Sequence, residues 1–145
     1  MTAPKVLTWD DYLGALRQLA EKITAQNFHP DMLVAVARGG WIPTRFLSDL
    51  LKVKKIASIG MAYQDASRQK LITYSFPDPI QAGQRILLIE DCLESGKSLI
   101  AASDQLRAEG AKLKTAALYY TSHSHIVPDF SLGSVLAVPK FPWEQ

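Results

Sequence analysis

Residues 85–99, RILLIEDCLESGKSL, leave little choice of local structure. A continuous apolar run ends in two adjacent acids, Glu90 and Asp91. A small-residue loop with Gly96 follows and leads into a segment with helical character. A strand without polar alternation is typical of a parallel sheet whose two faces are both covered. The stretch therefore predicts a buried strand, a short loop and a helix.

The same order of elements occurs nearer the start of the chain. The apolar run MLVAVA, residues 32–37, ends at Arg38, Gly39 and Gly40, and a helix is expected from about Pro43, since proline suits the first helical turn. Patterning elsewhere predicts helices over 8–23 and 98–111 and strands over 55–63, 71–76, 85–90, 114–120 and 134–139, with 55–63 and 71–76 antiparallel.

Two strand–loop–helix units with continuous apolar strands predict an α/β fold, a mostly parallel sheet flanked by helices. In such sheets, ligands bind at the carboxyl ends of the strands. The segments ARGG and EDCLESGKS both fall at strand ends of this kind. We therefore expect the binding site to form where these two segments meet.

Composition narrows the classes of function. The chain has 145 residues, which fits one domain over 1–145, and its net charge of +2 gives no reason to expect a nucleic-acid or membrane partner. Cys92 is the single cysteine, so an intramolecular disulfide is excluded. No apolar window is long enough for a membrane span, and the N-terminus lacks the core of a signal peptide. A cytoplasmic protein is the simplest interpretation.

The letters SGKS suggest a Walker A loop, but the rest of that motif is missing. A Walker A loop needs a glycine five residues before its Gly-Lys pair, because the backbone wraps closely around the phosphates. Here that position is Asp91, five residues before Gly96, and its carboxylate would repel phosphate. A nucleoside triphosphatase is therefore the weakest interpretation of this stretch.

The segment suits a sugar phosphate better. Ser95, Gly96, Lys97 and Ser98 run into a helix N-terminus, where free amides favour a phosphate monoester. Glu90 and Asp91 are placed to accept hydrogen bonds from vicinal hydroxyls or to hold hydrated magnesium. From the residues alone, solvated loop acids beside an ordinary turn remain an equally good explanation.

The stretch ILLIEDCLESGKSL resembles the phosphoribosyl pyrophosphate (PRPP) motif of the type I phosphoribosyltransferases, most closely the bacterial xanthine-guanine enzymes. VLTWDDYLGALRQLAEKI is similar to their opening helix, VAVARGGWIPTRFLSDLL to their pyrophosphate loop, YQDASRQK to their mobile loop and FPWEQ to their C-terminal ending. The resemblance implies a Rossmann-like sheet with a flexible hairpin flap and a small C-terminal hood. It also implies a homodimer or homotetramer.

The implied reaction is transfer of the 5-phosphoribosyl group from PRPP to a 6-oxopurine, xanthine, guanine or hypoxanthine, with Mg²⁺ and release of pyrophosphate. Pyrophosphate would bind at Arg38, Gly39 and Gly40, where a tight turn is the structural alternative, and the peptide bond near Arg38 is expected to be unusual. Glu90 and Asp91 would hold the ribose or the metal, the latter directly or through its bound waters. The PRPP set implied for the ribose and 5-phosphate is Glu90, Asp91, Leu93, Glu94, Ser95, Gly96, Lys97 and Ser98.

Two further roles follow from the resemblance. Asp91 and Glu94 are the implied catalytic residues, and Glu94 stands where the family usually has an aspartate that exchanges a proton with the purine. Its side chain is one methylene longer. Tyr63, Arg68 and Lys70 belong to the implied flap, for which a solvated hairpin tip predicts the same composition.

The base pocket departs from the family pattern. The lysine that the resemblance implies just after the strand at 114–120 is missing, and Val138 or Pro139 stands in the place of the stacking aromatic. The base-binding candidates are Tyr119, Tyr120, Lys140, Phe141 and Trp143. These departures leave two alternatives open: a non-catalytic regulator that binds PRPP or a nucleotide, and a phosphoribosyltransferase with a non-purine acceptor.

Two other features have ordinary explanations. His123 and His125 form a His-Ser-His pattern, but without an apparent third ligand a surface loop is the better interpretation than a metal site. Cys92 is expected to be a packing residue rather than a nucleophile.

Overall fold

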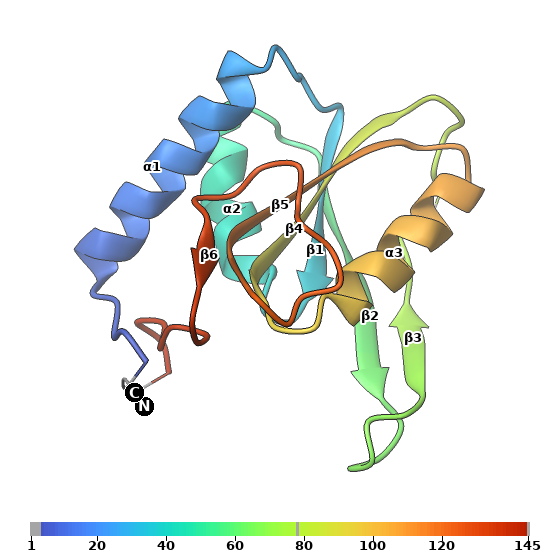
Figure 1. The fold of residues 1–145 in the computed structure, drawn as a ribbon. Helices are drawn as coiled ribbons and strands as arrows, with labels where there is room; N and C mark the ends of the chain where they lie inside the picture. The colour runs from blue at the N-terminus through green and yellow to red at the C-terminus, as the bar shows by residue number, and fades with distance from the viewer. Residues whose placement is uncertain (1–3, 78, 145) are drawn as a thin grey trace.

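A computed structural model describes residues 4–77 and 79–144. The described residues form a sheet of six strands in the order β3-β2-β1-β4-β5-β6, parallel except for β3, with three helices (Figure 1). The elements are α1 (Trp9–Ala25), β1 (Met32–Ala37), α2 (Trp41–Leu51), β2 (Ile56–Tyr63), β3 (Leu71–Ser75), β4 (Arg85–Leu93), α3 (Lys97–Ala108), β5 (Lys112–Thr121) and β6 (Ser134–Val135). The predicted α/β fold is confirmed.

The core has two layers because β1, β4 and β5 are apolar on both faces. One cluster joins α1 and α2 to one face of the sheet, with Leu16 and Leu47 packed near Leu87 and Leu118. The other joins α3 to the opposite face. Figure 1 shows α1 and α2 together on one side and α3 on the other. This burial on both faces explains why the strands lack polar alternation.

Helix α1 begins as the sequence predicts. The Thr8 hydroxyl accepts a hydrogen bond from the Asp11 amide at 3.1 Å, and the Asp11 carboxylate accepts one from the Thr8 amide. This capping box satisfies two amides that the helix start would otherwise leave without partners. Every helix in the described part of the chain is too short or too polar to cross a membrane.

Two differences from the predicted strand boundaries bear on the site. Strand β4 continues three residues beyond Glu90, because Cys92 and Leu93 pair with Tyr119 and Tyr120 of β5. Asp91 therefore lies inside the strand, as Glu90 does, rather than in the following loop. The strand expected over 134–139 is wrong beyond Val135: the Leu136 side chain is 86% exposed, and Pro139 has no amide to donate to a ladder.

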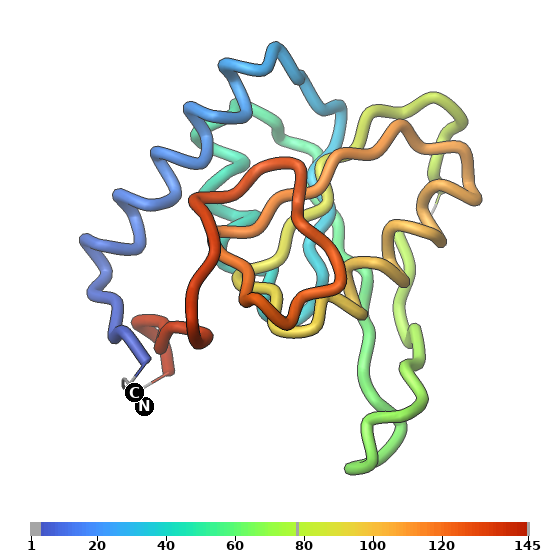
Figure 2. The backbone as a smooth tube through the Cα atoms, viewed as in Figure 1, coloured from blue at the N-terminus to red at the C-terminus, as the bar shows by residue number. Residues whose placement is uncertain are grey.

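The hairpin formed by β2 and β3 projects past the edge at which the parallel strands end (Figures 1 and 2). Gly60 allows this pairing, since a Cβ atom at that position would meet the ring of Tyr74 on the neighbouring strand. The two ends of the described chain also meet: Leu7 donates a hydrogen bond to the Lys140 carbonyl at 2.9 Å. The site described below thus lies between a projecting hairpin and the C-terminal segment.

Candidate active site

The loops that follow β1 and β4 lie next to one another because these strands are parallel neighbours. The first loop contains Arg38, Gly39 and Gly40 and leads into α2; the second contains Glu94–Gly96 and leads into α3. The peptide bond between Ala37 and Arg38 is cis, so the expectation of an unusual peptide there is confirmed. The sheet therefore places two loop–helix junctions at one edge, as the sequence predicts.

Positions 39 and 40 must be glycine because atoms of β1 and β4 come too close to leave room for a Cβ atom. A Cβ atom at Gly39 would lie 2.7 Å from Asp91 Oδ2 and 2.8 Å from Asp91 Oδ1. At Gly40 it would meet the carbonyl oxygen of Ile89, and it would lie 2.8 Å from the Val36 carbonyl oxygen. Because contacts this short force the backbone to move, the first loop touches β4 only as long as both positions are glycine.

Glu90 and Asp91 form an unusual pair of half-buried acids. Burial, and then the neighbouring charge of Asp91, raise the pKa of Glu90 to about 8. Burial raises the pKa of Asp91 to about 6, against a hydrogen bond of 2.6 Å that its Oδ1 accepts from the Cys92 amide, and the Glu144 carboxylate adds to the rise. Neither ion pair found among the described residues involves these acids. Such a pair is suited to bind hydroxyl groups or a cation.

The loop after β4 presents backbone amides at the start of α3. Gly96 has a φ of 77°, which favours glycine, and the Ser95 hydroxyl accepts a hydrogen bond from the Lys97 amide at 3.3 Å. The amides of the first helical turn lack partners within the helix, and with the helix dipole they favour an anion. The predicted residues Ser95–Ser98 therefore lie at a helix N-terminus.

The segment 121–125, at and after the end of β5, is hydrogen-bonded to this loop. The Thr121 hydroxyl donates to the Glu94 carbonyl at 2.8 Å, and the His125 amide donates to the Ser95 carbonyl at 2.9 Å. A Cβ atom at Gly96 would lie 2.8 Å from the Ser124 hydroxyl oxygen, so this segment also covers the glycine. No local sequence pattern predicts this contact, because it joins segments about 30 residues apart.

The β2–β3 hairpin, the loop Glu94–Gly96 with the start of α3, and the segment after β5 line a cavity of about 410 Å³. Of the predicted flap residues, Tyr63 and Arg68 line it, and the Arg68 guanidinium lies 4.8 Å from the centroid of the Tyr63 ring. Lys70 is exposed and does not line this cavity. The full lining is Tyr63, Ser67, Arg68, Glu94, Ser95, Lys97 and His123. This cavity, here called the flap cavity, is rich in cationic side chains.

A second cavity of about 410 Å³, here called the hood cavity, is lined by Asp91 and shares no lining residue with the flap cavity. It brings together Arg38, Asp91 and Trp143, three residues that the sequence analysis assigned to pyrophosphate, ribose and base. The remaining lining residues are Gly39, Trp41, Ile42 and Glu144. The C-terminal segment therefore reaches the acids of β4.

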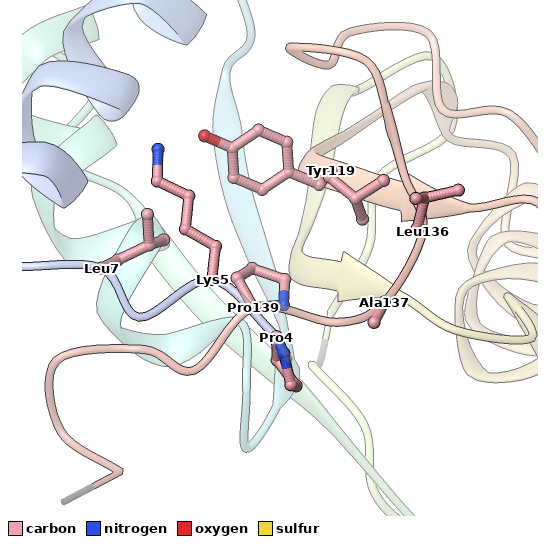
Figure 3. Close-up of a pocket in the computed structure, with 8 residues that line it drawn as sticks. Pro4, Lys5, Leu7, Tyr119, Leu136, Ala137 and Pro139 are labelled. Atoms are coloured by element: carbon pink, nitrogen blue, oxygen red, sulfur yellow. The ribbon is translucent and has the colours of Figure 1, made fainter. Parts of the chain in front are cut away.

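The other base-binding candidates are scattered. Tyr119 lines a separate cavity of about 330 Å³ with Lys5, between the N-terminal segment and the residues after β6 (Figure 3). Tyr120 packs on the α3 side of the sheet, and Lys140 is exposed. Phe141 is only 2% exposed, with its ring stacked on Trp143 and edge-on to Tyr12. The prediction that Phe141 contacts a base does not fit this burial.

The acids of β4 and the neighbouring Cys92 bear on whether the site suits a metal ion or a reactive thiol. No group of three or more His, Cys, Asp or Glu side chains in the described ranges is arranged to hold a metal. Magnesium needs no such group, since it commonly keeps several waters and uses one or two carboxylates, and Glu90 and Asp91 fit that requirement. Burial raises the pKa of the Cys92 thiol to about 12, which fits a packing residue rather than a nucleophile.

Comparison with known proteins agrees with this architecture. A family model for the phosphoribosyl transferase domain matches residues 5–144. The purine phosphoribosyltransferase of Pyrococcus horikoshii superposes with a TM-score of 0.88 at 29% identity, covering 99% of this chain and 95% of that one. The xanthine-guanine-hypoxanthine phosphoribosyltransferase of Helicobacter pylori gives 0.87 at 25% identity, covering 97% and 93%.

A third similar structure is a hypothetical protein of Neisseria gonorrhoeae with bound ppGpp, which has a TM-score of 0.85 at 21% identity and covers 100% of this chain and 92% of that one. At that identity the similarity supports the fold alone. The match of the family model covers nearly the whole described chain and includes both loops of the site. The chain therefore belongs to the phosphoribosyltransferase family and is a PRPP-dependent enzyme of that family.

Proposed function

We propose that the protein transfers the 5-phosphoribosyl group from PRPP to a 6-oxopurine, either xanthine, guanine or hypoxanthine, and releases pyrophosphate. The observation that carries the proposal is the place of Glu90 and Asp91 near the carboxyl end of β4, with an anion-binding loop starting after Leu93 and Gly39 against Asp91. The order of these groups matches PRPP, whose ribose hydroxyls lie between two phosphate-bearing arms. An isolated phosphate site would not require buried acids beside it.

Each part of PRPP has its own contacts in this proposal. The carboxylates of Glu90 and Asp91 accept hydrogen bonds from the ribose hydroxyls, beside Leu93 at the end of the strand. The amides of Ser95–Ser98 hold the 5-phosphate. Arg38 supplies a forked donor to pyrophosphate, and Gly39 and Gly40 let the backbone come close. The hood cavity joins Arg38 to Asp91, which supports adjacent sites for pyrophosphate and ribose.

Magnesium fits the same acids. Glu90 and Asp91 would hold the ion, directly or through its waters, and it would neutralise charge on the pyrophosphate that leaves. Burial disfavours the ionised form of both carboxyls and raises their pKa values. A cation bound beside them would stabilise that ionised form.

The reaction breaks the bond between C1 of the ribose and the pyrophosphate oxygen and forms a bond between C1 and a purine nitrogen. The electron pair of the breaking bond leaves with pyrophosphate. The proton on the attacking nitrogen passes to the Glu94 carboxylate, which lines the flap cavity and is exposed before substrate binds. Closure of the hairpin that carries Tyr63 and Arg68 would exclude water from the positive centre that develops at C1.

The purine acceptor rests on different support. The two relatives at 25–29% identity are named for purine bases. In this chain, Trp143 is half-buried beside Asp91 and offers an aromatic ring next to the ribose site. Assembly as a homodimer or homotetramer and a cytoplasmic location stay predictions.

The test is release of pyrophosphate from Mg²⁺–PRPP with xanthine, guanine, hypoxanthine, adenine or no base. Release that requires a 6-oxopurine, and a matching nucleoside monophosphate by mass spectrometry, is the expected result. The matched pair of variants is Asp91→Asn, which should be inactive, and Asp104→Asn on the exposed face of α3, which should behave as wild type. Protection by PRPP against thermal unfolding without turnover on any base would contradict the proposal and favour a regulator.

A further inference from the structure

We propose that His123 is an additional ligand of the 5-phosphate of PRPP, acting together with Lys97. This inference rests on the proposed function, because it assumes that a phosphoribosyl compound occupies the site. Both side chains line the flap cavity, one from the segment after β5 and the other from the first residue of α3. They approach the anion-binding loop from two different elements.

The position of His123 is fixed relative to the phosphate loop. The Thr121 hydroxyl accepts a hydrogen bond from the His123 amide at 3.2 Å and donates one to the Glu94 carbonyl at 2.8 Å. Two residues further on, the His125 amide donates to the Ser95 carbonyl at 2.9 Å. His123 is therefore held on both sides by bonds to the loop that would hold the phosphate.

The charges around the cavity favour an anion at this place. Lys97 and Arg68 are cationic, Glu94 is the carboxylate of the lining, and the remaining side chains are Tyr63, Ser67 and Ser95 with neutral hydroxyls. An imidazole N–H added to this set donates to a phosphate monoester and, when protonated, adds a further positive charge. The Ser95 hydroxyl lies in the same lining, whereas the Ser67 hydroxyl donates to Asp65 Oδ1.

The 5-phosphate fits better than pyrophosphate as the partner of His123. The segment that carries His123 is hydrogen-bonded to the loop of Glu94 and Ser95, whereas Arg38 and Gly39 line the hood cavity, which shares no lining residue with the flap cavity. A histidine in the flap cavity is thus on the phosphate-loop side of the ribose acids. His125 is the natural control, because only its backbone amide contacts the loop and its side chain does not line the cavity.

The experiment compares His123→Ala with His125→Ala by calorimetric titration of two probes, ribose 5-phosphate and pyrophosphate, in the presence of Mg²⁺. We expect His123→Ala to raise the dissociation constant for ribose 5-phosphate about tenfold, the loss typical of one hydrogen bond to a charged group, and to leave pyrophosphate unchanged. His125→Ala should change neither. In turnover, KM for PRPP should rise for His123→Ala with kcat within about twofold, since the contact is made before and during reaction.

A double variant tests the partnership with Lys97. The losses of His123→Ala and Lys97→Met should be non-additive if both side chains bind one phosphate group. Equal affinity of His123→Ala and wild type for ribose 5-phosphate would overturn the inference, as would an equal loss for pyrophosphate. If the alanine variant does not fold, the same titration with His123→Phe decides, since phenylalanine fills the ring's space without a donor.

The outcomes separate this inference from the proposed function. Wild-type protein that binds ribose 5-phosphate and turns over PRPP, with His123→Ala unchanged, would refute the role of His123 alone. Wild-type protein that binds neither ribose 5-phosphate nor PRPP would refute both.

Discussion

The side of the site proposed for PRPP and the side proposed for the acceptor differ in the groups that form them. On the phosphate side, Gly39 and Gly40 press backbone against β4, Gly96 has a left-handed φ, and two acids sit within a buried strand. On the side proposed for the acceptor, Tyr119 and Leu136 line one cavity and Trp143 lines the hood cavity, so side chains rather than close backbone contacts form most of the lining. One side is specified by backbone geometry and the other by exchangeable side chains.

The difference between the two sides indicates which residues determine the choice of base. Backbone amides bind phosphate whatever the neighbouring side chains are. A substitution that moves this backbone therefore impairs PRPP binding itself. Side chains that line an apolar cavity can be exchanged with smaller consequences. We therefore expect substitutions on the phosphate side to abolish PRPP binding and those on the acceptor side to change the choice of base.

The largest effect is expected for Asp91→Asn. Removing the charge of this buried carboxylate takes away its hydrogen bonds to the ribose hydroxyls or its contact with magnesium, so PRPP affinity should fall at least about a hundredfold. Calorimetry with Mg²⁺–PRPP measures this loss, with Asp104→Asn as the control. Undiminished affinity would show that Asp91 does not face the ribose.

Glu94→Gln should separate chemistry from binding. The amide cannot take a proton from the purine, so kcat should fall about a hundredfold, at the low end of what a general base contributes. PRPP affinity should stay within about threefold, because the loop amides are unchanged. Steady-state kinetics with both substrates provides the comparison. Equal losses in kcat and in PRPP affinity would make Glu94 a binding residue.

Gly39→Ala tests the contact between the two loops. The new Cβ would lie 2.7 Å from Asp91 Oδ2, so the carboxylate or the loop must move, and PRPP affinity should fall about tenfold. Gly14→Ala is the matched control, since nothing lies within 4 Å of a Cβ there and the change in α1 should stabilise the helix by up to about 1 kcal/mol. Wild-type affinity in Gly39→Ala would refute the need for close approach.

The buried acids predict an unusual pH dependence of stability. The pKa of Glu90 is raised from 4.5 to about 8 and that of Asp91 from 3.8 to about 6, so the folded state holds protons that the unfolded state releases. Without ligand, the midpoint of thermal unfolding should therefore fall by a few degrees, roughly, as pH rises from about 5 to 8.

The Asp31–Arg85 pair does not interfere with this measurement. Hydrogen bonds from Arg85 lower the pKa of Asp31 to about 2, so its contribution is lost only as pH falls below about 4. In Glu90→Gln most of the decline between pH 5 and 8 should disappear. A decline of the same size in that variant would place its source elsewhere.

The smallest effect is expected on the acceptor side. Tyr119→Lys introduces the lysine that the sequence resemblance implies after this strand, on the side of the sheet where Trp143 packs, and an ammonium group there should donate to the exocyclic oxygen of a 6-oxopurine. KM for that base should fall about threefold, within the energy of one exposed hydrogen bond, with KM for PRPP unchanged. A change in PRPP affinity instead would show that the two sides of the site are not separate.

The sequence predicted the two strand–loop–helix units well because their signals are local. The apolar run before Glu90, the glycines after Arg38 and the loop before α3 each determine structure within a few residues. The extension of β4 to Leu93 depends on pairing with Tyr119 and Tyr120 of β5, which no local pattern reveals.

The acceptor side was harder to predict for the same reason. Phe141 was a candidate for base contact, but its burial against Tyr12 and Trp143 follows from the packing of the C-terminal segment on α1. His123 is exposed in a loop, as the sequence predicts, but only the folded structure shows that this loop lines the flap cavity. Contacts between distant segments decided both positions.

Titration of the wild-type protein with PRPP in the presence of Mg²⁺ tests the central claim most directly, with heat release and the shift of the unfolding midpoint recorded together. The account predicts saturable binding of one PRPP per chain, with a matching rise in the unfolding midpoint. It also predicts that a purine base added without PRPP or pyrophosphate binds more weakly. A folded protein that shows neither heat nor stabilisation with PRPP would contradict the account.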